Sequence, residues 1–301
     1  MPDPSRTLYV TCPAYAAESP RRRAEALRRA DAFARSAGLT AVASPLLDIH
    51  PGVNRWLDPE LRLQDLRTAL RHPFIWAFRG GYGSVHLLPG LARLARNRRR
   101  GPVLIGYSDL TCLHAAWWTR GWPSWYGTLP EPGEADSWRI GSLDRLRSGR
   151  ELAWTERSVA SGRVLRPGAA RGRLFAGCLS VLQALAGTRF QPDLRGTVLA
   201  LEDVDEKPYR WDRALVQMDG AGMLKGVRAL LVGSAGGEEH PDYAGPDAAD
   251  IVADWADRLR IPALAGLPFG HGEDAAVLPL GAETSLVADG KGPAWSLSVT
   301  P

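Results

Sequence analysis

The stretch VLIGYSDLTCLHAAWW, residues 103–118, joins an apolar segment to a helical one through a sharp turn at Gly-Tyr-Ser-Asp. The apolar and β-branched residues before Gly106 favour a buried strand, and the residues from Thr111 onward favour a helix. A serine at such a corner has two common roles. Ser108 could cap the helix, or it could be a nucleophile held at a strand-to-helix turn, as in the G-x-S-x-G elbow. Leu110 replaces the second glycine of that motif, so the rest of the chain must decide.

The strand-to-helix pattern repeats on the N-terminal side of this stretch. Apolar segments alternate with amphipathic segments that begin at capping residues or prolines. The expected strands lie within 7–14, 39–47, 74–84 and 102–110, and the expected helices within 19–38, 58–73, 87–101 and 111–121. This alternation predicts an α/β fold with a mostly parallel sheet. Ligands bind beyond the carboxyl ends of strands in such sheets, and both RGGYGS (79–84) and GYSD (106–109) lie at such ends.

The pattern weakens between residues 131 and 172, where Pro, Gly, Ser and charged residues mix. We interpret this segment as a linker with one or two short strands. A second unit follows, with an expected turn and helix (173–188), strands (196–204 and 227–235), helices (211–222 and 247–259) and terminal strands. We therefore expect an N-terminal domain at 1–130, a linker at 131–172 and a C-terminal domain at 173–301.

The composition of the 301 residues is typical of a globular protein, with 45% hydrophobic and 23% charged residues. The net charge of +4 is modest, and the basic stretches resemble solvated helix faces, so we expect no nucleic-acid partner. We see neither a secretory signal nor a run of about 18 apolar residues, and we expect a cytoplasmic protein without membrane contact. Cys12, Cys112 and Cys178 lack paired or metal-ligand spacing, so buried free thiols and no metal are expected.

A catalytic serine needs a base, an acid that orients the base, and backbone donors for the oxyanion. His271 stands between two glycines after an apolar segment, which suits a functional side chain or, equally, a tight turn. Glu202 ends a buried strand, where a carboxylate is costly unless it is paired or lies at a site edge; its alternative role is a cap. The amide of Asp109 and an amide of the loop 79–83 could meet an oxyanion, although such a loop could instead cradle phosphate.

Five stretches together resemble the LD-carboxypeptidase family, which also contains the microcin C immunity peptidases. They are RGGYGS (79–84), IGYSDLTCLHAAW (105–117), GCLSVLQALAGT (177–188), LEDVDEKPYRWDRALVQMDGAGML (201–224) and LPFGHG (267–272). The resemblance implies an N-terminal α/β domain similar to glutamine amidotransferases and a smaller, β-rich α/β C-terminal domain. It also implies a cofactor-free serine peptidase that forms a homodimer.

Matched motif by motif, the resemblance implies a catalytic triad. The nucleophile would be Ser108 of GYSD, the acid Glu202 of LED and the base His271 of GHG. The oxyanion hole would be made by the backbone amides of Asp109 and Gly81. The first domain would then supply the serine, and the second would supply the acid and the base.

The resemblance also implies a substrate, a cytosolic muropeptide processed in peptidoglycan recycling. The scissile amide would join an L-centre of meso-diaminopimelate or lysine to a terminal D-alanine. Arg79 and Tyr82 are candidate substrate contacts, and Arg79 would bind the terminal carboxylate of the D-alanine. The alternative substrate is a microcin-type acyl-nucleotide or a related peptide-like amide, and the Trp-rich segment 117–125 could stack on its ring or pack in the core. A binding protein without turnover is a third hypothesis, against which the intact Ser, Glu and His argue.

Two stretches depart from the pattern that the family commonly shows. GCLS, with Cys178, stands where GNLS is usual, and Tyr-Gly-Thr (126–128) stands where HGP is usual. We expect both positions to line the cleft and to influence the choice of substrate.

Overall fold

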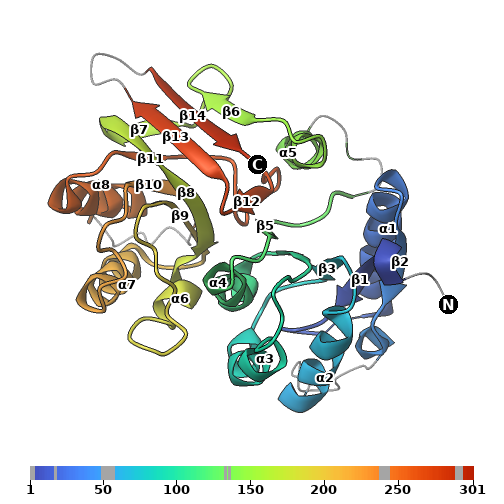
Figure 1. Cartoon of the computed structure of the whole chain (residues 1–301). Helices are drawn as coiled ribbons and strands as arrows, with labels where there is room; N and C mark the ends of the chain where they lie inside the picture. The colour runs from blue at the N-terminus through green and yellow to red at the C-terminus, as the bar shows by residue number, and fades with distance from the viewer. Residues whose placement is uncertain are drawn as a thin grey trace.

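The structure, a computed structural model, describes residues 4–16, 19–48, 58–131, 134, 137–236, 245–288 and 294–301. Its main strands form two sheets, one of six strands in the order β12-β5-β4-β3-β1-β2 and one of eight in the order β6-β14-β13-β8-β9-β10-β11-β7 (Figure 1). The predicted α/β class with a mostly parallel N-terminal sheet is therefore confirmed. The similarity to glutamine amidotransferases stays a prediction.

The six-stranded sheet is parallel apart from one edge strand. Its parallel strands are β2 (Thr40–Ala43), β1 (Thr7–Thr11), β3 (Phe74–Ala77), β4 (Val103–Gly106) and β5 (Ser124–Tyr126). The edge strand, β12 (Leu278–Leu280), comes from the C-terminal part of the chain and runs antiparallel to β5. The C-terminal part of the chain thus completes the N-terminal sheet.

Helices cover both faces of this sheet because alternate strand residues point to opposite sides. In β1, Leu8 and Val10 face α1 (Pro20–Ser36) and α5 (Trp138–Arg147). Tyr9 faces the side of α2 (Pro59–Ala69), α3 (Leu88–Leu94) and α4 (Thr111–Thr119). Short 3-10 turns complete this half, namely η1 (Pro4–Arg6), η2 (Pro45–Asp48), η3 (Ser84–Leu87) and η4 (Ser108–Leu110).

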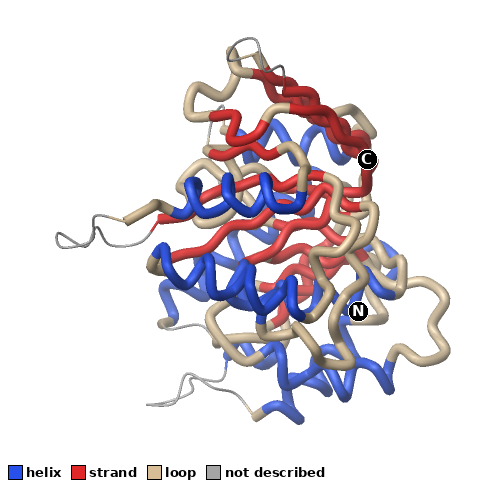
Figure 2. The backbone as a smooth tube through the Cα atoms, turned by 90° about the vertical axis from the view of Figure 1, so that its left-hand side faces the viewer, coloured by secondary structure: helices blue, strands red, loops and turns tan. Residues whose placement is uncertain are grey.

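The eight-stranded sheet has a parallel centre and antiparallel edges. The parallel strands are β8 (Gly168–Cys178), β9 (Thr197–Val204), β10 (Ala229–Gly236) and β11 (Ala263–Ala265). The antiparallel strands are β6 (Leu152–Thr155), β14 (Trp295–Thr300) and β13 (Glu283–Ala288) on one side and β7 (Arg163–Arg166) on the other. Three helices pack on one face, α6 (Leu179–Gln183), α7 (Pro208–Gly220) and α8 (Ala248–Leu259). Figure 2 shows strands crossing the middle of the molecule beside the helices, with further strands at the top of the view.

The start of the second unit differs from the expectation. Residues 173–178, expected to begin a turn and helix, belong to the long strand β8, and the helix α6 is only five residues long. Buried central strands and buried helices are both apolar, so periodicity alone does not separate them. The neighbouring chain passes close to β8 at Gly172, where a Cβ would lie 2.3 Å from the carbonyl oxygen of Gly196.

The segment expected to be a linker carries more structure than one or two short strands. Within 131–172 lie α5, β6, β7 and the beginning of β8, and all three strands join the eight-stranded sheet. The eight-stranded sheet therefore contains strands from residues 131–172 as well as from the C-terminal stretch 173–301. The division at 1–130, 131–172 and 173–301 stays a prediction, which limited proteolysis would test.

The described helices include none long and apolar enough to cross a membrane. The three cysteines, Cys12, Cys112 and Cys178, are free and buried, as expected.

Candidate active site

The turn after β4 holds Ser108 in a strained backbone conformation. Its φ is +63°, in the left-handed region that residues other than glycine rarely adopt. Gly106 makes the turn compact, because a Cβ there would lie 3.1 Å from Cγ of Leu110. Leu110 itself is fully buried inside the turn. The residue that breaks the G-x-S-x-G pattern thus fills the interior of the elbow, and Ser108 sits at its tip.

The structure distinguishes the two roles considered for Ser108, a helix cap and a residue presented at the tip of a turn. Neither η4 nor α4 has a side-chain cap, and within the described part of the chain the Ser108 hydroxyl makes no hydrogen bond. The capping alternative is therefore wrong. The Ser108 backbone, in contrast, is bonded at both polar groups: its amide donates to the Tyr126 hydroxyl at 3.1 Å, and its carbonyl accepts from the Thr111 hydroxyl at 2.7 Å.

Glu202 and His271 form a pair at the carboxyl ends of β9 and β11. The Glu202 side chain is fully buried, and its Oε2 lies 2.6 Å from Nδ1 of His271. Ser234, from β10, donates to the same Oε2 at 3.3 Å and accepts from the His271 amide at 2.7 Å. Tyr126 donates to the other oxygen, Oε1, at 2.5 Å. The carboxylate is therefore met by three donors, which offsets the cost of burying it.

The electrostatics of this pair follow from burial and charge. Burial alone would lower the pKa of His271, but the hydrogen bond and the negative charge of Glu202 outweigh it and raise that pKa above its ordinary value. Burial, together with the same charge, raises the pKa of Tyr126 well above its ordinary value. Tyr126 thus stays a neutral phenol that can donate to Glu202.

The glycine before His271 explains the GHG motif. Gly270 has a φ of +100°, and a Cβ there would lie 2.4 Å from Oγ of Ser234 and 2.6 Å from Oε2 of Glu202. Only glycine allows the chain to pass this close to the carboxylate. Gly270 thus lets the chain bend beside the carboxylate, and the functional role of His271 stays a prediction.

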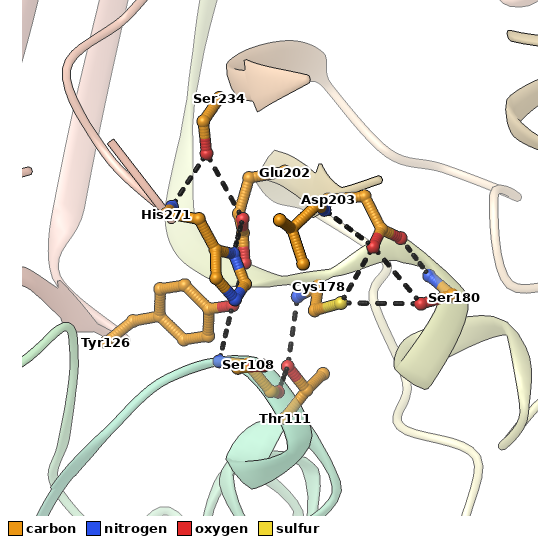
Figure 3. Close-up of polar contacts among 10 residues, drawn as sticks. Ser108, Thr111, Tyr126, Cys178, Ser180, Glu202, Asp203, Ser234 and His271 are labelled. Carbon is orange, nitrogen blue, oxygen red and sulfur yellow. Dashed lines mark hydrogen bonds and ion pairs between the residues drawn. The ribbon is translucent and has the colours of Figure 1, made fainter. Parts of the chain in front are cut away.

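The pair lies beside the elbow, although it comes from the other sheet. The His271 ring packs against Tyr107, the neighbour of Ser108, with 5.0 Å between ring centroids. In Figure 3 the imidazole points from Glu202 toward Ser108. Across the described residues no hydrogen bond joins the Ser108 hydroxyl to His271.

The glycine-rich loop after β3 packs on the elbow. A Cβ at Gly80 would lie 3.0 Å from Oγ of Ser108 and 3.2 Å from the amide nitrogen of Asp109. The Asp109 carboxylate accepts from the amides of Gly83 and Ser84 at 3.3 and 2.8 Å. This clamp brings the loop next to the predicted oxyanion donors. Gly80 is the glycine in contact with Ser108, and the assignment of Gly81 as a donor stays a prediction.

The two candidate substrate contacts lie in different places. Arg79 lines a pocket of about 290 Å³ that also contains Tyr107 and Thr128, and its guanidinium carbon lies 5.6 Å from the Tyr15 ring centroid. Tyr82 is 41% exposed and packs edge-on against His86. The pocket next to the elbow therefore involves Arg79, while Tyr82 lies on the surface.

The Trp-rich segment belongs to the packing of the molecule. Trp117 and Trp122 are buried in the core and meet edge to face, with 5.3 Å between their ring centroids. Trp118 packs on Phe175 at 5.3 Å in the same geometry. Of the two open interpretations of residues 117–125, these contacts favour core packing.

Of the two departures from the family pattern, Cys178 does not line the cleft as expected, whereas the YGT stretch reaches it through Thr128. Cys178 is only 3% exposed, and its thiol contacts Ser180 and Asp203, both at 3.4 Å. Tyr126 is fully buried beneath the elbow. Thr128 is the residue of the YGT stretch that reaches the pocket.

Sequence reasoning missed three contributions to the site. These are the hydroxyl of Tyr126, the hydroxyl of Ser234 and the clamp made by the Asp109 carboxylate. Tyr126 and Ser234 each lie at the carboxyl end of a strand next to one that carries a candidate residue, which is the signal that could have indicated them. Among the described residues no group of three or more His, Cys, Asp or Glu is arranged to hold a metal ion.

Comparison with known proteins identifies relatives for both halves of the chain. Residues 8–127 match the family model of the LD-carboxypeptidase N-terminal domain, and residues 171–286 match that of the LD-carboxypeptidase C-terminal domain. The murein tetrapeptide carboxypeptidase of Pseudomonas aeruginosa is 31% identical over 243 residues, which cover 74% of this chain and 76% of that protein.

Solved structures share the whole architecture. The muramoyltetrapeptide carboxypeptidase of Oxalobacter formigenes superposes with a TM-score of 0.78 at 26% identity, over 97% of this chain and 99% of the other. An MccF-like protein of Streptococcus pneumoniae, solved in complex with AMP, has a TM-score of 0.73 at 19% identity, over 97% and 98% of the two chains. At that identity the second comparison supports the fold alone.

Proposed function

The chain belongs to the LD-carboxypeptidase family, whose members are serine peptidases, and from this premise we propose that it removes the terminal D-alanine from muropeptides. The proposed scissile bond joins the L-centre of meso-diaminopimelate or lysine to that D-alanine. The proposed role is peptidoglycan recycling in the cytosol, and the proposed catalytic residues are Ser108, Glu202 and His271.

The observation that supports the proposal most strongly is the Glu202–His271 pair beside the elbow. A buried carboxylate 2.6 Å from Nδ1 fixes the imidazole so that Nδ1 carries the proton and Nε2 is free to accept one. The serine at φ +63° sits at a strand-to-helix turn of the kind that presents a nucleophile. An acid beside a base, and a base beside a serine, is the arrangement that acyl transfer needs.

In the proposed reaction His271 takes the proton of the Ser108 hydroxyl as the oxygen attacks the amide carbonyl. Glu202 stabilises the imidazolium that forms. The amides of Asp109 and Gly81 donate to the oxyanion. His271 then gives its proton to the leaving amino group, D-alanine departs, and water attacks the acyl-enzyme to regenerate Ser108.

Recognition of the terminal carboxylate is assigned to Arg79. Its guanidinium lines the pocket that also borders Tyr107, next to the proposed nucleophile. An arginine binds a carboxylate through paired hydrogen bonds, which suits a carboxypeptidase substrate. This assignment concerns substrate binding, so it predicts an effect on KM.

The test is incubation of the purified protein with a tetrapeptide muropeptide, with Ser108→Ala as the control. Release of D-alanine by the wild type alone would support the proposal. Turnover of an aminoacyl-nucleotide conjugate but not of the muropeptide would replace it with the immunity-type hydrolase. Tight binding without turnover, equal in both proteins, would indicate a binding protein.

We also propose a homodimer, as the family resemblance implies. Sedimentation velocity across a concentration series would test this, and a single monomeric species at all concentrations would contradict it.

A further inference from the structure

Two hydroxyl groups hold the elbow without a part in the proposed chemistry. The Tyr126 hydroxyl accepts from the Ser108 amide at 3.1 Å, and the Thr111 hydroxyl donates to the Ser108 carbonyl at 2.7 Å (Figure 3). Both backbone polar groups of the strained residue Ser108 are therefore bonded to side chains. Such strain persists only where the surroundings over-determine it.

Each of these hydroxyls also contacts the second sheet. The Tyr126 hydroxyl donates to Oε1 of Glu202 at 2.5 Å, and the Thr111 hydroxyl accepts from the Cys178 amide at 3.0 Å. Cys178 of β8 and Glu202 of β9 are direct partners in the register of those strands. Two bridges thus run from Ser108, in the turn that follows β4, to a single pair of residues in the second sheet.

Both bridges lie in tightly packed surroundings. Tyr126 and Thr111 are fully buried. Gly177 leaves no spare room, because a Cβ there would lie 2.8 Å from Cγ2 of Thr111. Buried hydrogen bonds to a charged carboxylate are stronger than neutral ones, so the Tyr126 bridge should hold more firmly than the Thr111 bridge.

We propose that Tyr126 and Thr111 are positioning residues, which fix the location of Ser108 relative to the Glu202–His271 pair. This inference rests on the proposed function for the identity of the nucleophile and the base. It adds that the alignment between the two sheets is set by these two hydroxyls.

The two bridges differ in one measurable respect. Tyr126 donates to Glu202, so its loss leaves more of the negative charge to act on His271. The pKa of His271 should then rise further, because Glu202 is already what raises it. The other groups near His271 are the Tyr107 ring and the more distant carboxylates of Asp203 and Asp205, and a change at Tyr126 leaves them in place. Loss of the Thr111 hydroxyl removes no donor from Glu202.

The experiment compares Tyr126→Phe, Thr111→Val and the hydroxyl-retaining Thr111→Ser with the wild type. Four quantities are measured: kcat and KM for D-alanine release, the rate at which a fluorophosphonate ester modifies Ser108, and the pKa of His271 by NMR titration. We expect Tyr126→Phe and Thr111→Val to lower kcat and the modification rate about ten- to hundredfold, with KM changed by less than about twofold. Thr111→Ser should stay close to the wild type, and only Tyr126→Phe should raise the pKa of His271.

The outcomes separate this inference from the proposed function. A wild type that the fluorophosphonate modifies but that releases no D-alanine would refute the substrate, and the modification rates of the variants would still decide the positioning role. Folded variants, verified by circular dichroism, that react at the wild-type rate would overturn the inference. A rise in KM at unchanged kcat would also overturn the inference. A wild type that reacts with neither the muropeptide nor the fluorophosphonate would overturn it as well. If Thr111→Val does not fold, Tyr126→Phe and Thr111→Ser carry the comparison.

Discussion

Gly80→Ala is the substitution that most directly tests the space beside the proposed nucleophile. The added Cβ would lie 2.8 Å from Cβ of Ser108, 3.0 Å from its Oγ and 3.2 Å from the amide nitrogen of Asp109. Carbon atoms pack at about 3.5–4.0 Å, so either the loop at residue 80 or the elbow at Ser108 must move. Ser108 is held by hydrogen bonds at its amide and its carbonyl, so the loop at residue 80 would have to shift, which would displace the proposed oxyanion donor Gly81.

The expected magnitude follows from that overlap. Loss of one oxyanion donor lowers kcat by about 10²–10³, and we expect Gly80→Ala to lower kcat/KM by an amount of this order. Overpacking should lower the free energy of unfolding by about 1–3 kcal/mol. Gly80 does not have a positive φ, so alanine adds no backbone strain of the left-handed kind.

The assay is D-alanine release under steady-state conditions, with urea unfolding of the same preparations. Gly141→Ala is the matched control: Gly141 lies within α5, and a Cβ there meets no atom within 4 Å. This control should keep wild-type kcat/KM and gain roughly 0.5–1 kcal/mol of stability, because alanine is favoured over glycine in helices. A Gly80→Ala enzyme within about threefold of wild-type kcat/KM would refute the placement of the oxyanion beside Gly80.

Four further results are expected. Glu202→Gln should lower kcat about 10²–10⁴-fold and lower the pKa of His271, because burial then acts without the opposing charge; an unchanged pKa by NMR titration would contradict this. The acid limb of kcat/KM should lie above pH 6.5, the ordinary value of histidine, since His271 must be neutral to accept a proton. The same raised pKa means that the pair stabilises the fold fully below the unfolded-state value and that this stabilisation is lost as pH rises through the folded-state value. The stability difference between wild type and His271→Asn, measured by urea unfolding, should therefore be larger at acidic than at alkaline pH, and equal differences would count against it. Arg79→Ala should raise KM for the tetrapeptide at nearly constant kcat, and an unchanged KM would remove Arg79 from the substrate site.

Local sequence patterns were sufficient for much of the fold. The helices of the N-terminal half begin where caps and prolines indicated: Ser19 caps α1 by accepting from Arg22, and Asp58 caps α2 by accepting from Glu60. The strand–turn–helix unit at 103–118 is also as expected. These features depend on residues within a few positions of each other, so a single sequence contains the information.

The features that escaped prediction depend on partners distant in the sequence. β8 is a strand because β9 and β13 pair along it, and its apolar residues alone are equally compatible with a helix. Tyr126 contacts a carboxylate 76 residues away, and Ser234 meets His271 across 37 residues. No local spacing indicates such contacts, whereas the candidate triad could be proposed because each member lies in a short recognisable motif.

The pairing of β12 with β5 has a consequence for how the protein is made. Ribosomal synthesis proceeds from the N-terminus, and early domains begin to fold while the rest is still being translated. Until residues 278–280 leave the ribosome, β5 is an unpaired edge, and an exposed edge invites association with other chains. Glu202 and His271, the proposed acid and base, also emerge long after the proposed nucleophile Ser108. The nascent peptidase should therefore stay inert, and depend on protection of that edge, until nearly the whole chain has been translated.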